Sequence, residues 1–443
     1  MEVKNYDGIG EKLYAETLKN GLTAYVAVKR GYLQSYALFA ADYGGADRKF
    51  RRDAGTAETP AGVAHFLEHK MFDTPDGKNA LNVLSENGAS PNAWTSQSMT
   101  AYHFSCTAGF EENLKTLLEF VSVPYFTSDG VLKEQGIITQ EILMSEDDPG
   151  YAVYTNLMKC LYSENPVKDS VAGTVESISA ITDEILYTCH KAFYNPANMV
   201  LCVAGDVDPA AVFETARKVL PGEPGSLPEC DYGAAESPLP KSARFSAVMP
   251  VSAPQYLIGA KVKAAANGEA RLVQQLTGEL ALRCLMGRSS PFYTRLYAKG
   301  LINAEFDYEF DCAANAATIL FGGESRDPEA VLSEFNDEIA AVGRNGLDKN
   351  LFERSRKAHY GSMLRATEKF SLLCSGIAEG RFAGYNYLDS FDLLSGICSS
   401  DVESFILNNL KSEKLAMSAV CPRTDDGAAR PGIPGSKGLD RDD

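Results

Sequence analysis

The chain has 443 residues, too many for one ordinary hydrophobic core, so we expect two domains of about 200 residues each. Hydrophobic residues make up 45% and charged residues 23%, which is typical of a folded globular protein. The net charge of −17 argues against a partner such as nucleic acid or an anionic membrane. An acidic surface that keeps the protein soluble explains this charge without any special ligand.

The N-terminal sequence has neither the basic start nor the apolar core of an export signal, and no apolar run is long enough to span a membrane. Ten cysteines are scattered without CxxC or disulfide-framework spacing. We therefore expect reduced cysteines in a cytoplasmic protein.

The first half of the chain alternates short apolar runs rich in β-formers with segments of helical apolar spacing. In chain order, we predict strands at 22–29 and 35–45, helices at 61–72 and 78–88, strands at 89–95 and 99–107, helices at 109–121 and 128–146, and a strand followed by a helix within 197–220.

Residues 221–243 are dense in proline, glycine and serine, as in an interdomain linker, and the pattern of elements then begins again. The second half has predicted strands at 245–250 and 254–262, helices at 271–287 and 290–299, strands at 303–310 and 317–323, and helices from Pro328 onward.

A shift of 220 residues lays predicted helices of the first half on helices of the second, which indicates a degenerate internal duplication. The expected organisation is a first α+β domain over 1–220, a linker over 221–243 and a second, related α+β domain over 244–423. Residues 424–443 are charged and rich in proline and glycine, so we expect them to be disordered.

The sequence HFLEH, residues 65–69, has the spacing of a metal site. On a helix, His65 and His69 share a face and can bind one ion, with Glu68 beside them. Zinc suits two imidazoles and a carboxylate, so a third ligand is needed from elsewhere. Glu68 would then be the general base. The alternative is an ordinary helix on which Glu68 is only an ion-pair partner.

Glu134 and Glu141 lie seven residues apart on the predicted helix 128–146, so both face the same way. One of them could be the third ligand and the other a supporting carboxylate. The spacing does not choose between them, and a solvated pair is the ordinary reading of two helix glutamates.

Together with EQGIITQE, GASPNAWTSQSMTAYHF, GTVESISAIT and FYNPANMVLCVAGDVDP, the motif HFLEH resembles the inverted-zincin metallopeptidases, which include pitrilysin, insulin-degrading enzyme and the mitochondrial processing peptidase. The resemblance spans about residues 10–423 and is strongest to a half-size bacterial subgroup. It implies domains built on antiparallel-rich sheets with packed helices, and a zinc-dependent endopeptidase.

The resemblance also implies roles for individual residues. It makes His65, His69 and Glu141 the Zn²⁺ ligands, Glu68 the base and Glu134 a supporting carboxylate. It places Asn92 and Ala93 at a sheet edge where an extended peptide substrate pairs; Asn92 as a mere turn residue is the alternative. The other histidines, at 103, 190 and 359, are expected to be structural.

The second half of the chain lacks both the metal-site residues of the first half and a residue pair that is common in the family. Under the 220-residue shift the metal-site positions carry Leu285, Arg288, Ser289 and Gly361, so no second zinc site is expected. The family's C-terminal halves often carry an arginine and a tyrosine seven residues apart that hold the substrate, but Tyr297 and Ala304 stand at those positions. Arg295 is a candidate substitute.

The chain equals one half of a full-length family member, so the resemblance implies a dimer that encloses the substrate, and the missing pair favours a heterodimer with a paralogue. A monomer with an open site is the alternative. Two other functions stay open: a non-catalytic peptide-binding or assembly subunit, and a purely structural zinc, which would need neither Glu68 nor an open coordination position.

Overall fold

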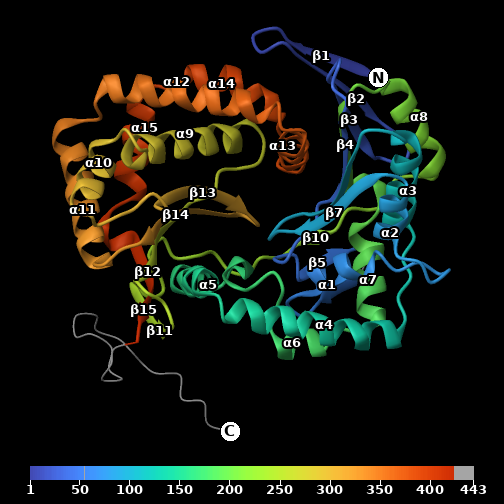
Figure 1. Ribbon diagram of the computed structural model, residues 1–443, viewed down its shortest axis with the longest axis horizontal. Coiled ribbons are helices and arrows are strands. Elements are labelled where there is room, and N and C mark those ends of the chain that lie inside the picture. The colour runs from blue at the N-terminus through green and yellow to red at the C-terminus, as the bar shows by residue number, and fades with distance from the viewer. Residues whose placement is uncertain (54, 424–443) are drawn as a thin grey trace. The chain divides into compact units, whose positions relative to one another are not determined.

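Figure 1 shows the computed structural model of the chain, which describes residues 1–53 and 55–423. The predicted tail, 424–443, lies outside the described residues. The chain forms two compact units, each with helices packed on a mainly antiparallel sheet, so the predicted α+β class is confirmed. Unit 1 contains residues up to Ile142, Ser170–Tyr232 and Ser362–Asp389; unit 2 contains Leu143–Asp169, Gly233–Gly361 and the chain from Ser390 onward.

Unit 1 holds most of the first half of the chain and one helix from the second half. Its elements are β1 (Glu2–Tyr6), β2 (Glu11–Thr17), β3 (Thr23–Val28), β4 (Ser35–Ala41), β5 (Lys49–Arg52), β6 (Gly55–Glu58), α1 (Val63–Lys70), α2 (Ala80–Glu86), β7 (Ala89–Thr95), β8 (Thr100–Cys106), α3 (Phe110–Ser122), α4 (Ser128–Glu146, which ends in unit 2), α6 (Val175–Ser179), α7 (Asp183–Phe193), β9 (Met199–Gly205), α8 (Pro209–Val219), β10 (Glu229–Cys230) and α13 (Phe370–Phe382).

The main sheet of unit 1 has seven strands in the order β1-β2-β3-β9-β4-β8-β7, and a small sheet of three strands has the order β10-β5-β6. In the main sheet only β3 and β9 run parallel. Phe39, Tyr102 and Phe193 have no exposed surface and lie in the hydrophobic core of this unit. β7 stands at the sheet edge, next to β8 alone, and this edge matters for the site described below.

Unit 2 holds most of the second half of the chain and one helix from the first half. Its elements are α5 (Pro149–Leu161), β11 (Arg244–Met249), β12 (Gln255–Val262), α9 (Glu269–Met286), α10 (Pro291–Ala298), β13 (Asp307–Ala313), β14 (Ala316–Glu324), α11 (Pro328–Asn345), α12 (Lys349–Ala366, which ends in unit 1), α14 (Ser390–Gly396), α15 (Ser399–Asn409) and β15 (Leu415–Pro422).

The five strands of unit 2 form one sheet in the order β11-β15-β12-β14-β13, in which only β11 and β15 are parallel. Helices cover both faces. On one face, a Cβ at Gly259 would lie 3.1 Å from side-chain atoms of Leu157 and Leu161 of α5. On the other, α9 lies so close to β13 that a Cβ at Gly278 would meet the Phe310 ring at 2.5 Å. Glycine at this position therefore sets the distance between α9 and the sheet.

The two halves of the chain exchange one helix each, which the predicted contiguous domains 1–220 and 244–423 did not include. α5 packs on β12 and β15 of unit 2, whereas α13 packs on β9 and β4 of unit 1. The boundaries differ because apolar periodicity shows that one face of a helix is buried, but not which sheet buries it.

The predicted internal duplication agrees with the helix boundaries in its central part. Shifted by 220 residues, α4 covers 348–366 and α5 covers 369–381, each within one residue of α12 and α13 respectively. The register is looser at α1, which falls on 283–290, the end of α9 and the turn before α10. The exchanged helices α5 and α13 are therefore equivalent elements of the two repeats.

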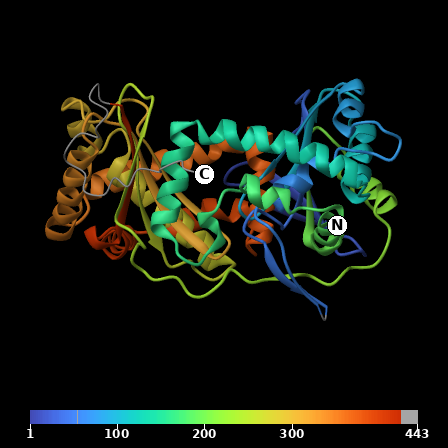
Figure 2. The ribbon, with the colours of Figure 1, turned by 90° about the horizontal axis from the view of Figure 1, so that it is seen from below.

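Most of the predicted linker forms neither helix nor strand (Figure 2), and each of its ends contacts the unit to which it belongs. Within it, β10 pairs with β5 of unit 1. On the unit 2 side, Glu236 Oε1 accepts hydrogen bonds from three consecutive backbone N–H groups, at residues 163–165. Its other carboxylate oxygen lies 3.0 Å from Lys261 Nζ. The change of unit occurs between Tyr232 and Gly233, inside the predicted linker.

Candidate metal centre

The helix that carries HFLEH is fixed at its start by a glycine and along its length by buried apolar side chains. Gly62 precedes α1 with φ of 95°, and a Cβ there would lie 2.6 Å from the carbonyl oxygen of Ala172. A left-handed backbone and a close neighbour both favour glycine at this point. Phe66 and Leu67 are fully buried, so the opposite face of α1 presents His65 and His69 to the site.

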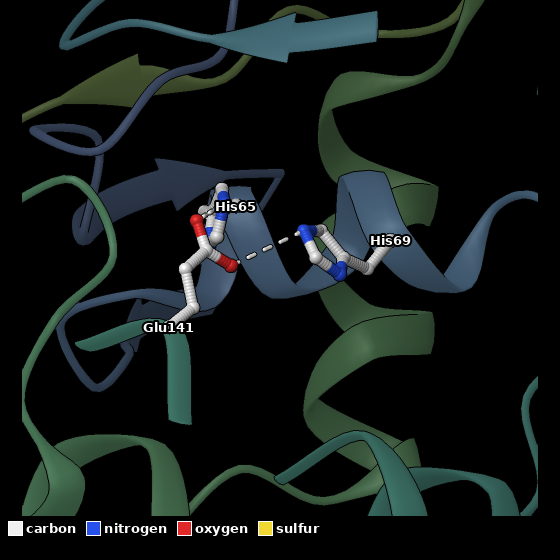
Figure 3. Close-up of side chains that lie close together, drawn as sticks. All are labelled: His65, His69 and Glu141. Carbon is white, nitrogen blue, oxygen red and sulfur yellow. Dashed lines mark ion pairs between the residues drawn. The ribbon is translucent and has the colours of Figure 1, made fainter. Parts of the chain in front are cut away.

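Glu141 of α4 meets both imidazoles of α1 (Figure 3). Its Oε1 lies 3.4 Å from His65 Nε2, and its Oε2 lies 3.8 Å from His69 Nε2. Ile138 and Ile142, on the same helix, are buried in the core of unit 1 and hold α4 in place. Sequence spacing left two candidates for a third ligand, and only Glu141 joins the histidines in a group with metal-ligand geometry.

The three side chains fit a zinc ion. Their donor atoms lie within 4.8 Å of one another. Ligands on a tetrahedral zinc stand about 3.3 Å apart, given metal–ligand distances of about 2.0–2.2 Å, so small rotations suffice. Nε2 of His65 is the ring nitrogen that faces Glu141. The other ring nitrogen, Nδ1, is buried and has no hydrogen-bond partner among the described residues.

Glu134 lies behind His69 rather than among the ligand atoms. Its Oε1 is 3.1 Å from His69 Nδ1. A carboxylate can only accept, so Nδ1 carries the proton and the Nε2 lone pair is directed at the metal position. Lys70 Nζ lies 3.8 Å from Glu134 Oε2 and helps to hold the Glu134 carboxylate in place. The same ammonium group also donates a hydrogen bond to Asp73. Lys70 was not among the predicted site residues.

Glu68 lies next to the ligand group and is 7% exposed. Its Oε2 accepts a hydrogen bond of 2.6 Å from Thr95 Oγ1, at the end of the edge strand β7. Thr95 was not among the predicted site residues. Its position in the quoted segment GASPNAWTSQSMTAYHF was the available signal, but only the fold brings it against Glu68.

The site is rich in negative charge around two imidazoles. Burial lowers the pKa of His69, but its hydrogen bond to Glu134 and the charges of Glu68, Glu134 and Glu141 outweigh this, so its pKa is raised. Hydrogen bonding to His65 is the main reason why the pKa of Glu141 is lowered. Burial raises the pKa of Glu134, but its hydrogen bond with His69 and the nearby charges of His69 and Lys70 lower it below its usual value. A concentration of carboxylates of this kind favours a bound cation.

Asn92 and Ala93 lie in β7, where they pair with His103 and Tyr102 of β8. Asn92 is thus a strand residue and not a turn residue, and its exposed side chain accepts a hydrogen bond from the Ala93 N–H. The other side of β7 has no strand partner among the described residues. The predicted contact with substrate stays a prediction, and the free edge is compatible with it.

The remaining candidates lie outside the metal group. Arg295 lies 3.0 Å from Glu334 and 2.8 Å from Glu338, so its guanidinium is already engaged and the prediction that it binds substrate gains no support. His190 contacts the carbonyl of Val121. His359 pairs with Glu279 at 3.2 Å, and His103 lies within β8. Within the described residues, His65, His69 and Glu141 form the one group with metal-ligand geometry.

Comparison with known proteins identifies the family of this chain. The family model for insulinase (peptidase family M16) matches residues 55–175, and the model for the peptidase M16 inactive domain matches residues 180–358. An uncharacterized zinc protease, YmfH of Bacillus subtilis, is 35% identical over 427 residues, which cover 95% of this chain and 99% of that protein. This chain belongs to the M16 peptidase family. The resemblance predicted from its motifs is confirmed.

Other known proteins are also similar to this chain. An uncharacterized zinc protease of Streptomyces coelicolor is 25% identical over 391 residues, 84% of each chain. The crystal structure of an M16-like peptidase from Alicyclobacillus acidocaldarius is similar with a TM-score of 0.89 and 32% identity, over 93% of this chain and 98% of that one. The periplasmic protease PqqL of Escherichia coli shares the fold at 16% identity and a TM-score of 0.72, and this chain covers 51% of it.

All of the candidate metal ligands lie in the part of the chain that the first family model matches. His65, His69 and Glu141 all lie within the range matched by the first model, and the second model carries the word inactive in its description. In addition, none of the described helices combines the length and the apolar character that a membrane crossing requires.

Proposed function

We propose that this M16 protein is a zinc-dependent endopeptidase that hydrolyses peptides or unfolded polypeptide segments. The observation that carries the proposal is the joint presence of three ligands and a separate carboxylate. His65, His69 and Glu141 would hold the ion, and Glu68 stands beside them without belonging to the ligand group. Three protein ligands leave one position of a tetrahedral site open, as in catalytic zinc sites.

Each residue of the site would have its own role in peptide hydrolysis. A bound zinc supplies Lewis acidity, which lowers the pKa of water and polarises a carbonyl. Glu68 accepts the proton of the attacking water and returns it to the leaving amine. The Thr95 hydroxyl holds one oxygen of Glu68 and leaves the other for this transfer. Glu134 keeps the proton of His69 on Nδ1.

The free edge of β7 would bind the substrate. An extended peptide can add to this edge through backbone hydrogen bonds, with Asn92 and Ala93 among its contacts. Thr95 at the end of the same strand touches Glu68, so a peptide on this edge would pass close to the base. Backbone pairing is tolerant of sequence and requires an unfolded segment, which fits the proposed class of substrate.

This chain covers 51% of PqqL, which supports the proposal that it works as a dimer, in which a second chain would correspond to the rest of PqqL. A heterodimer with a paralogue remains the favoured form, because Tyr297 and Ala304 stand where the family's arginine and tyrosine are expected. A cytoplasmic location is likewise proposed, because the ten cysteines are scattered without disulfide-framework spacing.

The test is zinc content and cleavage of a mixed peptide library by the wild type and by Glu68→Gln, each alone and with any co-encoded paralogue. The wild type should bind one zinc per chain and cleave, and the variant should keep the zinc but lose about 10²–10⁴-fold in rate. Equal cleavage by both proteins would refute the role of Glu68. Zinc binding without cleavage in any combination would instead favour the peptide-binding or assembly subunit.

A further inference from the structure

Unit 2 contains a pocket of about 480 Å³ where the end of α9, the turn into α10, the start of β13 and the middle of α12 come together. Three arginines line it: Arg283 on α9, Arg288 in the turn after α9, and Arg354 on α12. Two carboxylates, Glu305 and Asp307, also line it. Three guanidinium groups at one pocket are unusual in a chain of net charge −17, so this pocket calls for an explanation.

Two of these arginines have no partner among the residues that the structure describes. Arg288 and Arg354 are exposed, and within 1–53 and 55–423 neither makes a hydrogen bond or an ion pair. Arginines elsewhere in unit 2 include paired ones, since Arg295 lies 2.8 Å from Glu338 and Arg356 lies 2.8 Å from Glu353. The pocket therefore offers guanidinium groups that the fold itself does not use.

The internal repeat relates this pocket to the metal centre. Shifted by 220 residues, Glu68 falls on Arg288. Glu134 falls on Arg354, in the region where α4 and α12 match within one residue. At both positions a carboxylate beside the metal site is replaced by a guanidinium that lines the pocket. A site arranged for a cation in the first repeat thus corresponds to a site arranged for an anion in the second.

We propose that this pocket binds a carboxylate of a peptide, either the C-terminal carboxylate or an acidic side chain. The guanidinium fork of arginine matches the two oxygens of a carboxylate. Glu305 and Asp307 would repel a doubly charged phosphate more strongly than a singly charged carboxylate, which selects between the two anions. Tyr293 and Tyr308 add aromatic wall beside the charged groups. The choice of a peptide as the ligand rests on the proposed function.

The test measures binding of three labelled peptides to the full zinc-loaded chain carrying Glu68→Gln, so that the peptides are not consumed. One peptide has a free C-terminal carboxylate and no acidic side chain, the second is amidated and carries one internal glutamate, and the third is amidated without any acid. At least one of the first two should bind about tenfold more tightly than the third. The tighter of the two identifies the source of the carboxylate.

The double variant Arg288→Gln, Arg354→Gln should abolish this preference. The matched control is Arg344→Gln, which removes an exposed arginine of α11 outside the pocket and should leave the preference intact. Arg288→Lys with Arg354→Lys keeps the charge and should retain part of the preference. Equal binding of all three peptides, or a preference that survives in the double glutamine variant, would overturn the proposal.

Failure of this proposal can be told apart from failure of the proposed function. The wild-type chain is given the amidated peptide without acidic residues, whose hydrolysis needs no carboxylate pocket. If this peptide is cleaved but the binding assay shows no carboxylate preference, the pocket proposal is refuted and the proposed peptidase activity is supported. A carboxylate preference that depends on the two arginines, without any cleavage, would support the pocket and refute the peptidase.

Discussion

Thr95 Oγ1 donates a hydrogen bond of 2.6 Å to Glu68 Oε2 and so ties the end of the edge strand β7 to the helix that carries the metal ligands. This contact joins the strand that would hold the substrate to the carboxylate that would move the proton. It fixes one oxygen of Glu68 and thereby the direction of the other.

Thr95→Val should therefore reduce activity without removing the metal. Valine has nearly the same shape but cannot donate, so Glu68 is no longer held, and kcat/KM should fall about tenfold. Zinc content should stay at the wild-type level, because Thr95 is not in the ligand group. Thr95→Ser, which keeps the hydroxyl, is the matched control and should retain most of the activity. A valine variant with the kcat/KM of the wild type would show that this hydrogen bond does not orient the base.

Glu134→Gln should weaken zinc binding. The carboxylate accepts a hydrogen bond from His69 Nδ1, and loss of such a supporting carboxylate typically lowers metal affinity about 10–100-fold. The measurement is competition for zinc with a chelator of known affinity. Glu146→Gln, at the exposed end of the same helix, removes the same charge away from the site and is the control. Equal affinity of the two variants would contradict the role given to Glu134.

The sequence was sufficient to predict both helices of the site and the shared face of its two histidines. The predicted helix 128–146 has the observed bounds of α4, and the i, i+4 spacing put His65 and His69 on one face. Spacing could not separate Glu134 from Glu141, since both face α1. The distinction needed their distances: Glu134 reaches Nδ1 of His69, whereas Glu141 reaches the Nε2 atoms of both histidines.

Other parts of the fold were not predicted from the sequence. β1, β2 and α5 were not predicted, although α5 has a capping Asp148 and a proline in its first turn. The contact between Thr95 and Glu68 joins segments 27 residues apart, and the exchange of α5 and α13 joins segments much farther apart. Periodicity reports the burial of a face, but the partner of that face depends on how the whole chain folds.

Leu157→Ala should destabilise unit 2, although Leu157 belongs to the first half of the chain. The side chain is fully buried and lies against Gly259 of β12, so truncation should cost about 2–5 kcal/mol. Hydrogen exchange is the suitable measurement, because a chain of two units need not unfold in one step. Amides of β12 should lose protection while those of β4 in unit 1 keep theirs.

The control for this experiment is Leu132→Ala, a leucine on α4 that is 65% exposed. Its truncation should change stability by no more than about 0.5 kcal/mol. If Leu157→Ala lowered protection in β4 and not in β12, the assignment of α5 to unit 2 would be wrong.

His190 should make the stability of unit 1 depend on pH in the acidic range. Burial lowers its pKa from 6.5 to about 4, and its Nε2 lies 3.2 Å from the carbonyl oxygen of Val121. Between these two pH values the unfolded chain binds a proton that the folded chain does not. The stabilisation is therefore complete above about pH 6.5 and is lost as the pH falls towards 4, by about 3 kcal/mol at most.

His190→Gln isolates this contribution, because glutamine can donate to the same carbonyl but does not titrate. The free energy of unfolding is measured from pH 8 to pH 4 with a chelator present, so that the metal site is empty in both proteins. Above pH 7 the two curves should run parallel, and below it the wild type should fall more steeply by up to one proton. Parallel curves over the whole range would contradict the lowered pKa of His190 in the folded protein.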